Sequence, residues 1–233
     1  MELFFNNEYM TIARYPNEGW LRVGEVPQTG EKLIDLRTDG ITLGQHYGRF
    51  KYEGDRPSRW AESDDIWVHG YWVYDWSDSF HRVVKFDKNK KEIYPSEPYH
   101  GYGYRQGQRY YFLNILEELD SPGEWHLDRK SGILYFWPPS PVDEGVALVT
   151  TLKELFLSLE ETSYVTFKGI IFEASRASVV SISGGTNNKI AGCTFRNIAG
   201  NVVTISGGTE NSVTGCDIYD IAGSAISISG GDR

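Results

Sequence analysis

The last third of the chain repeats one pattern of apolar and polar positions every 23 residues. Each repeat contains a short run in which apolar and polar side chains alternate, such as Val203-Thr204-Ile205-Ser206. An alternation with a period of two predicts strands with one buried face, and no window carries a helical stripe. A glycine pair follows each run and permits the positive φ angles of a corner. The positions in register are Gly169, Gly192 and Gly215; Phe172, Phe195 and Ile218; Gly184-Gly185, Gly207-Gly208 and Gly230-Gly231.

This period predicts a solenoid, because a single unit of this length cannot bury its apolar face without a neighbour. Three short strands per repeat, stacked on their own copies, predict a right-handed parallel β-helix of about 23 residues per coil. The third repeat ends at Arg233 without a closing cap, whereas solenoids need terminal caps for solubility. We therefore expect this chain to be a fragment of a longer protein.

The residues before the repeats follow no fixed period and predict an irregular antiparallel β module. Asn6-Asn7 lies between two apolar runs, which is typical of a hairpin turn. A second hairpin is expected over residues 117–137. We assign residues 1–19 to an edge hairpin that leads into the module, residues 20–145 to an inserted antiparallel module, and residues 146–233 to the coils.

Composition narrows the class of function. The 23 basic and 32 acidic residues give a formal charge of −9, which argues against binding to nucleic acid or an anionic membrane. Aromatic residues make up 14% of the chain, enough for a core and an exposed aromatic surface. No run of 18 apolar residues is present, so we expect no membrane span. The N-terminus carries no basic-then-apolar signal segment.

Two groups of residues raise the question of metal or redox chemistry. Cys193 and Cys216 lie one period apart, and equivalent positions on adjacent coils are about 5 Å apart. A disulfide is conceivable there, but a ladder of reduced, inward-facing thiols is favoured. Glu117, Glu118, Asp120 and Glu124 lack the alternating oxygen ligands of a calcium loop and favour a hairpin turn. We therefore predict no metal and no cofactor.

Four separated runs resemble a carbohydrate-active β-helix family. They are ELFFNNEYMTIARYPNEGW, DDIWVHGYWVYDWSDS, LNILEELDSPGEWHLDRKSGILYFWPP and ISISGGDR, and they span nearly the whole chain. The chain is similar to glycoside hydrolase family 141 and, more distantly, to the β-xylosidases of family 120. The resemblance implies a pectate-lyase-like right-handed β-helix interrupted by a β-sandwich-like module. It also implies a bacterial protein, extracellular or periplasmic, that cuts fucosyl, xylosyl or related linkages in plant-type polysaccharides.

Acidic departures from the repeat mark candidate catalytic residues. Glycoside hydrolysis needs two carboxyl groups, about 5 Å apart for retention and about 6.5–9.5 Å apart for inversion. Asp217 replaces Thr194 of the previous coil, and Asp220 replaces Asn197. Asp232 lies in the GGDR motif, and the resemblance places the active site on the later coils. The structural alternative is that these carboxylates are solvated or stabilise turns, and that Arg233 forms a weak surface ion pair with Glu210.

The run WVHGYWVYDW holds the candidate substrate-binding residues. Flat aromatic faces stack on sugars, and nearby polar groups hydrogen-bond hydroxyl groups, as in many binding pockets. Alternation places His69 and Tyr71 on one face and Trp72 on the other, so one face is also expected to serve as core. The set is His69, Tyr71, Trp72, Asp75 and Trp76, together with Arg233 from the GGDR motif.

We therefore expect the parent protein to be a glycoside hydrolase that uses a carboxylate pair on a polysaccharide or oligosaccharide. The 233-residue chain alone is expected to be inactive, because coils that would complete a site are missing. Two alternatives stay open: a polysaccharide lyase on the same fold, and a non-catalytic glycan-binding solenoid. The charge of −9 counts against a lyase, which would need basic residues near a uronate.

Overall fold

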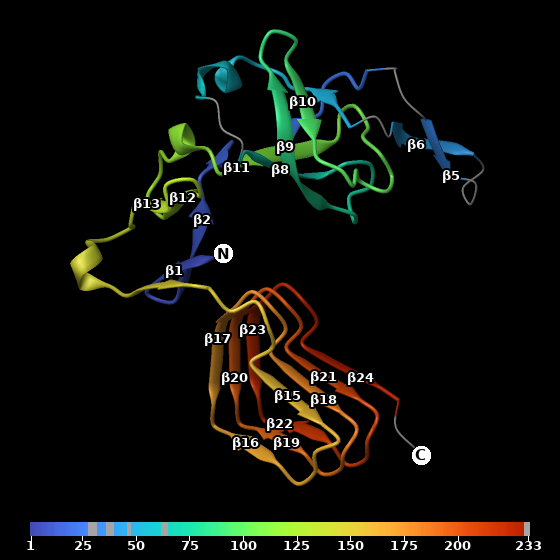
Figure 1. Ribbon diagram of the computed structural model, residues 1–233, viewed down its shortest axis with the longest axis vertical. Helices are drawn as coiled ribbons and strands as arrows, with labels where there is room; N and C mark the ends of the chain where they lie inside the picture. The colour runs from blue at the N-terminus through green and yellow to red at the C-terminus, as the bar shows by residue number, and fades with distance from the viewer. Residues whose placement is uncertain (28–31, 36–39, 46–47, 62–64, 231–233) are drawn as a thin grey trace. The chain divides into compact units, whose positions relative to one another are not determined.

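A computed structural model describes residues 1–27, 32–35, 40–45, 48–61 and 65–230 (Figure 1). The chain divides into two compact units. Met1–Met10 and Ser140–Arg233 form one, called here the solenoid unit, and Thr11–Pro139 forms the other, called the sheet unit. The boundaries predicted above for hairpin, module and coils stay predictions. Among the described residues, no helix is long and apolar enough to cross a membrane.

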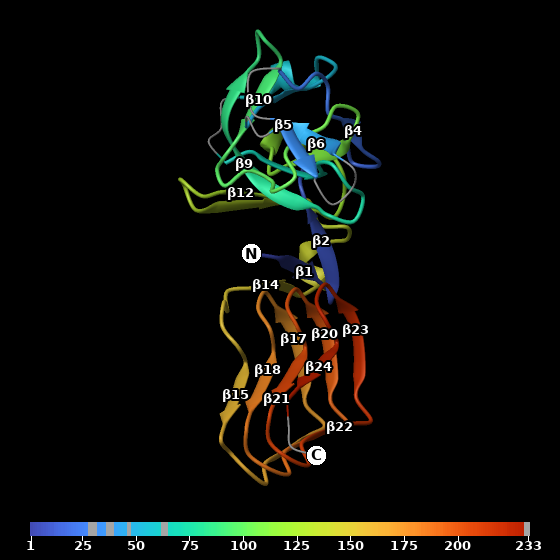
Figure 2. The same cartoon turned by 90° about the vertical axis from the view of Figure 1, so that its right-hand side faces the viewer.

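The solenoid unit confirms the predicted fold class, with about three turns spaced roughly 23 residues apart. The coils of this unit form three parallel sheets, in which each strand pairs with its copy in the adjacent repeat. Figure 2 shows these strands stacked coil upon coil. The first sheet comprises β15 (Leu157–Glu160), β18 (Val180–Ser183), β21 (Val203–Ser206) and β24 (Ile226–Ser229). The second comprises β16 (Thr166–Lys168), β19 (Lys189–Ala191) and β22 (Ser212–Thr214), and the third β17 (Ile171–Ser175), β20 (Thr194–Ile198) and β23 (Asp217–Ile221).

Identical kinds of side chain stack inside the solenoid. The Phe172 and Phe195 rings lie parallel, with centroids 4.9 Å apart, and Val180 pairs with Val203 in register. Each stacked pair removes apolar surface from water, and this burial stabilises the fold by roughly 25 cal/mol per Å². Cys193 is buried and Cys216 is partly exposed, and both thiols are free.

Glycine and asparagine form the corner between the first two sheets. Gly208 has φ +71°, and a Cβ built there would lie 2.4 Å from the Gly185 carbonyl oxygen. A side chain therefore cannot fit where one coil rests on the next. Asn188 is completely buried and donates through Nδ2 to Asn211 Oδ1 at 3.0 Å. Its own Oδ1 accepts from the Val165 N–H at 3.1 Å, so the corner amides satisfy one another from coil to coil.

The remainder of the solenoid unit includes the predicted N-terminal hairpin. The strand β1 (Leu3–Phe5) pairs antiparallel with β2 (Glu8–Ile12) on one side and β14 (Ala147–Val149) on the other. Asn6 and Asn7 adopt φ 52° and 66°, the left-handed conformation that asparagine tolerates. A short 3₁₀ helix, η3, covers Val142–Glu144.

The sheet unit is built around a seven-stranded antiparallel sheet in the order β3-β11-β8-β9-β10-β7, with β4 also pairing with β11. Two hairpins lie outside this sheet, and the β12–β13 hairpin is the one predicted over residues 117–137. The strands of the sheet are β3 (Arg14–Tyr15), β4 (Leu21–Arg22), β7 (Phe50–Lys51), β8 (Trp67–Tyr71), β9 (Ser79–Asp87), β10 (Glu92–Pro95) and β11 (Arg109–Leu113). The hairpins are β5 (Lys32–Asp35) with β6 (Ile41–Gln45) and β12 (Glu124–Asp128) with β13 (Ile133–Phe136); η1 covers Arg56–Arg59 and η2 Leu116–Glu118.

Large aromatic residues fill the core of the sheet unit. Trp72 is completely buried, and its ring centroid lies 5.4 Å from that of Phe50 and 5.2 Å from that of Tyr104. The Trp72 indole N–H donates to Ser79 Oγ at 2.9 Å, so its one polar atom is paired. Burial at this depth removes Trp72 from the predicted substrate-binding set, because no ligand can reach it.

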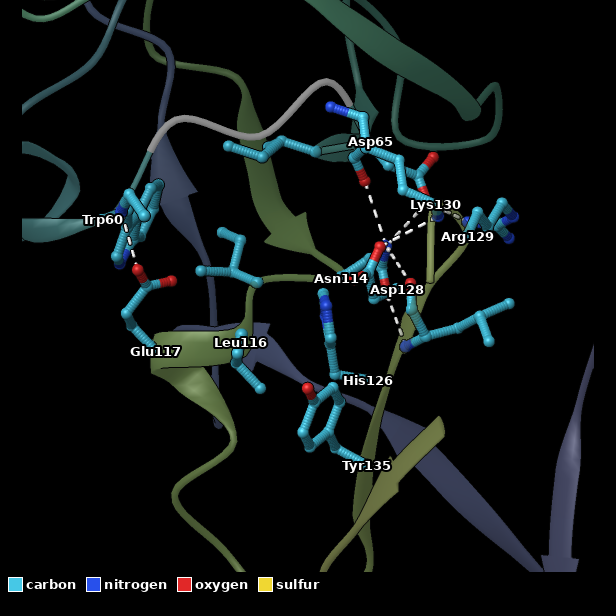
Figure 3. A pocket seen from close by; sticks show the side chains of 14 residues that line it. Trp60, Asp65, Asn114, Leu116, Glu117, His126, Asp128, Arg129, Lys130 and Tyr135 are labelled. Carbon is cyan, nitrogen blue, oxygen red and sulfur yellow. Dashed lines mark hydrogen bonds and ion pairs between the residues drawn. The ribbon is translucent and has the colours of Figure 1, made fainter. Parts of the chain in front are cut away.

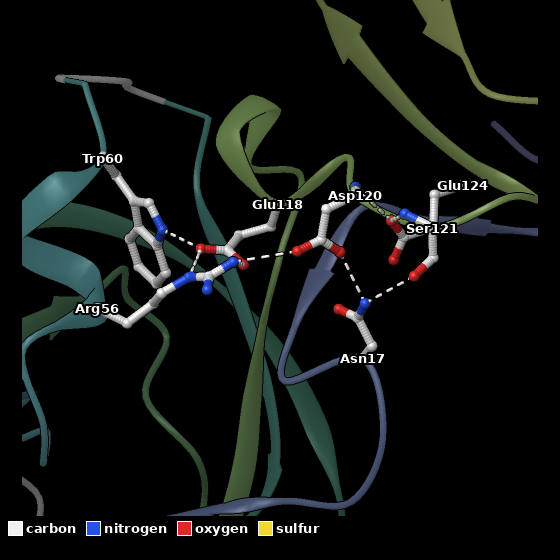
Figure 4. A network of polar contacts seen from close by, with 7 residues as sticks. All are labelled: Asn17, Arg56, Trp60, Glu118, Asp120, Ser121 and Glu124. Carbon is white, nitrogen blue, oxygen red and sulfur yellow. Dashed lines mark hydrogen bonds and ion pairs between the residues drawn. The ribbon is translucent and has the colours of Figure 1, made fainter.

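The acidic residues around η2 hold the sheet unit together (Figure 4). Glu118 is fully buried and accepts two hydrogen bonds from Arg56, at 2.9 and 2.8 Å, and a third from the Trp60 indole. Asp120 accepts from Arg56 at 3.0 Å and from Asn17 at 2.7 Å. A buried carboxylate with three donors is a structural anchor, and this agrees with the turn predicted from the spacing.

Candidate functional site

The outer face of the central sheet carries a row of aromatic rings. In the antiparallel register, His69 on β8 lies opposite Tyr111 on β11 and Phe80 on β9. The ring centroid of His69 is 5.0 Å from that of Tyr111 and 4.1 Å from that of Phe80. Residues on alternate positions of these strands point to the core, as Val68 and Tyr110 do. The row therefore follows directly from strand pairing.

Trp20 completes this surface. It comes from the connection between β3 and β4, is 38% exposed, and packs within 5.6 Å of Tyr71 and 5.0 Å of Tyr111 between ring centroids. We call Trp20, His69, Tyr71, Phe80 and Tyr111 the aromatic face. Phe80 is 56% exposed, so the aromatic face presents two large rings at its surface.

Charged groups line the aromatic face. His69 Nε2 lies 2.6 Å from Asp78 Oδ2, while its buried Nδ1 has no partner among the described residues. The Arg109 guanidinium lies 4.2 Å from the centre of the Tyr71 ring and 3.6 Å from the Asp75 carboxylate. Such a surface offers flat apolar rings with hydrogen-bonding groups at their edges, which is the chemistry that a sugar ring needs.

A second aromatic group lies on loops of the same unit. The rings of Tyr74 and Trp76 are stacked at 5.2 Å with an interplanar angle of 15°, and Tyr102 packs edge-on at 5.2 and 5.6 Å. Trp76 is 69% exposed, so one large ring is held by its neighbours yet open to solvent. We call these three residues the exposed triad. The strand β8 ends at Tyr71, so Tyr74 lies beyond the strand.

In the solenoid unit, Asp217 and Asp220 are both exposed on β23. Asp217 lies opposite Thr194 of the previous coil. Asp220 has φ 51°, and its equivalents Ala174 and Asn197 share this angle at 56°. Asparagine and aspartate tolerate the left-handed conformation better than most residues, so the backbone alone gives a reason for Asp220. The predicted residues Asp232 and Arg233 lie outside the described residues.

Next to Asp217, a polar row crosses the three coils. Arg196 contacts Glu173 Oε2 through Nε at 2.7 Å and through Nη2 at 2.6 Å. Tyr219, one coil further on, pairs with Arg196 in register, and its hydroxyl together with Glu173 raises the pKa of Arg196. The outer surface of the third sheet therefore carries a polar ladder beside the candidate carboxylate.

The sequence analysis named His69, Tyr71, Asp75 and Trp76, which stay predictions, and the structure places beside them several residues that it did not name. The neighbours come from other strands and loops, and no local pattern states which strands lie side by side. The alternation in Arg109-Tyr110-Tyr111 was the one available signal, since it predicts an outward Tyr111. The missed residues are Trp20, Phe80, Tyr102, Arg109 and Tyr111.

Comparisons with known proteins add evidence about the fold. No protein-family model matches the sequence, and no curated protein matches it significantly. A solved structure described as a glycoside hydrolase matches 95% of this chain with a TM-score of 0.60 and 12% sequence identity. The match covers 54% of that structure's chain, so this chain spans about half of its length. At this identity the likeness shows a shared fold.

Proposed function

We propose that this chain forms part of a glycoside hydrolase, and that the aromatic face and the exposed triad bind its polysaccharide substrate. The aromatic face is the observation that carries the proposal. The fold shared with a glycoside hydrolase and the resemblance of four sequence runs to families 141 and 120 support it. Plant-type side chains with fucosyl, xylosyl or related linkages are the proposed substrate, met outside the cytoplasm.

Binding follows from the geometry of the rings. A sugar has an apolar face, formed by its C–H groups, and a rim of hydroxyl groups. Tyr71 and Trp20 supply partly exposed rings on which the apolar face can stack. For the hydroxyl groups, Asp75 supplies a hydrogen-bond acceptor and Arg109 supplies donors. The exposed triad offers Trp76 as a further stacking platform. We assign His69 a supporting role, because it is only 7% exposed beneath the neighbouring rings.

Hydrolysis requires a carboxylate pair, for which Asp217, Asp220 and Asp232 are the proposed candidates. Adjacent coils are about 5 Å apart, which is also the spacing of the two carboxyl groups in a retaining enzyme. A carboxyl group stacked on Asp217 one coil further on would lie at the separation that a covalent, retaining mechanism uses. A carboxyl group two coils away would lie about 10 Å from Asp217. Arg233 is the proposed substrate contact beside Asp232.

Binding is tested by replacing exposed tryptophans. Trp76→Ala removes the platform, and we expect the affinity of the 233-residue chain for xylose-rich or fucosylated oligosaccharides to fall about fivefold, since ring stacking contributes about 1 kcal/mol. Trp137→Ala is the matched control, because Trp137 is 46% exposed but lies outside both aromatic groups. Isothermal titration calorimetry measures both. Equal losses in the two variants contradict the assignment of Trp76.

Hydrolysis is tested on the whole protein that contains this chain. We expect release of reducing sugar from a panel of plant glycans, reduced at least a hundredfold by Asp217→Asn if Asp217 is one of the pair. The exposed position of Asp217 and the backbone role of Asp220 favour one alternative, a non-catalytic glycan-binding solenoid. That alternative predicts binding that depends on Trp76 and no release from any glycan of the panel.

A further inference from the structure

A pocket separate from the aromatic face lies in the sheet unit, between the residues that follow β11 and the β12–β13 hairpin (Figure 3). Its volume is about 250 Å³. None of its lining residues belongs to the aromatic face or the exposed triad. Pockets for drug-sized ligands measure about 300–1,000 Å³, so this one suits a single small ring.

His126 on β12 is the unusual residue of this pocket. It is 7% exposed, and its buried Nδ1 has no hydrogen-bond partner among the described residues. Burial lowers the pKa of His126 and so favours the neutral imidazole. In Figure 3 the ring points from its strand into the pocket. A buried nitrogen without a partner carries a desolvation cost, and a small shift of the His126 ring that opened Nδ1 to a ligand hydroxyl would offset this cost.

Apolar and aromatic groups form one side of the pocket. The Tyr135 ring centroid lies 6.1 Å from that of His126, and Tyr135 is 38% exposed. Leu116, which is 43% exposed, and the buried Ile66 also line the pocket. The Tyr135 side chain therefore presents both a ring face and a hydroxyl group to a ligand.

The carboxylates of the pocket already accept hydrogen bonds from the protein. Asp65 accepts from Arg129, from Asn114 Nδ2 at 2.9 Å and from Trp67 Nε1 at 2.9 Å. Asp128 accepts from the backbone of its own turn, and Glu117 accepts from the Ala61 N–H at 2.6 Å. The described residues contain no group of three His, Cys, Asp or Glu side chains that could hold a metal ion. The pocket thus favours an uncharged ligand.

We propose that this pocket binds one neutral glycosyl residue, with His126 and the Tyr135 hydroxyl contacting its hydroxyl groups and Leu116 and the Tyr135 ring packing on its apolar face. The choice of a sugar rests on the proposed function, whereas the pocket itself shares no residue with the surface that carries that function. The pocket makes the sheet unit a two-site glycan binder, with one extended surface and one site for a single residue.

The imidazole of His126 provides a direct probe. The 233-residue chain is titrated with D-xylose, L-fucose and D-galactose, and the histidine ring signals are followed by ¹H–¹⁵N NMR. We expect a saturable shift of the His126 signal with at least one sugar. Tyr135→Phe removes one hydroxyl from a partly exposed residue and is expected to weaken binding about twofold to tenfold. Tyr164→Phe, at a residue 74% exposed in the solenoid unit, is the matched control and is expected to leave affinity unchanged.

The variant Trp76→Ala separates the two glycan proposals. A His126 shift that persists in Trp76→Ala supports the pocket, even if oligosaccharide binding to the aromatic face fails. Sugar-induced shifts that spare His126 and disappear in Trp76→Ala overturn the pocket and leave the proposed function standing. A His126 response to inorganic phosphate or calcium chloride but to no sugar also overturns it, as does the absence of any response in the folded chain.

Discussion

The two units of this protein reach a buried core by opposite routes. In the solenoid unit each strand pairs with its own copy, so Val180, Val203 and Ile226 follow one another in register. In the sheet unit, β11 pairs with β3, β4 and β8, which are distant from it in sequence. Because the solenoid unit repeats, the spacing of its apolar residues is enough to predict its core. The core of the sheet unit depends on strand pairings that no local sequence pattern predicts.

The two units also differ in the residues that can serve as spectroscopic probes. All seven tryptophans lie in the sheet unit, at positions 20, 60, 67, 72, 76, 125 and 137. All five histidines lie in the same segment of the chain. Tryptophan fluorescence therefore follows unfolding of the sheet unit alone, and far-UV circular dichroism follows both units. Each of the following experiments uses this difference.

The largest effect is expected from Trp72→Ala. Trp72 is completely buried among aromatic rings, and truncating such a residue destabilises a domain by about 3–5 kcal/mol. We expect the fluorescence transition in urea to move to lower denaturant, while a second transition, seen only by circular dichroism, keeps its midpoint. A shift of both transitions by the same amount would show that the two units unfold as one and would contradict the comparison.

The solenoid was the more predictable unit for a physical reason. Equivalent residues stack on one another in this fold, so the 23-residue period predicted both the glycine corners and the inward position of Phe195. In the sheet unit, which does not repeat, the sequence pattern predicted less. The alternation around β8 placed Trp72 opposite His69 and Tyr71, yet could not tell which of these faces a ligand would meet.

A smaller effect, confined to the solenoid, is expected from Gly208→Ala. The substitution adds a left-handed backbone penalty of about 1–2 kcal/mol and a clash with the Gly185 carbonyl, for a total of about 3 kcal/mol. Gly207→Ala is the matched control, because Gly207 has a similar φ of +69° but nothing within 4 Å of its Cβ. We expect the circular dichroism transition to fall further for Gly208→Ala, with fluorescence unchanged. Equal shifts for the two variants would mean that stacking at the corner imposes no steric limit.

The candidate site was predictable only in part. Composition and the WVHGYWVYDW run pointed to Tyr71 and Trp76, because aromatic residues beside carboxylates suggest glycan binding wherever they lie. Trp20 and Tyr111 join them only through the order of the strands, and His126 gives no sequence signal at all. A lone histidine between Trp125 and Leu127 is typical of a strand, and its unpaired nitrogen is a property of the packing.

The smallest effect is expected from acid, and it too should be confined to the sheet unit. Burial lowers the pKa of His81 to about 4, with His100 acting in the same direction, while the Ser96 carbonyl opposes it. Between pH 6.5 and 4 the unfolded chain therefore binds more protons at this position than the folded one, so stability falls as the pH falls. From pH 6.5 to 5 the loss is about 2 kcal/mol.

Urea titrations at pH 7 and pH 5 measure this loss through the tryptophan signal. His81→Phe removes the titrating group beside Trp72, and we expect it to flatten the pH dependence of the fluorescence midpoint. The buried His126, whose pKa is also lowered, leaves a residual slope of the same sign. The solenoid transition should move little over this range, because its segments contain no histidine. A pH dependence that stays unchanged in His81→Phe would assign the acid sensitivity to groups other than His81 and contradict this prediction.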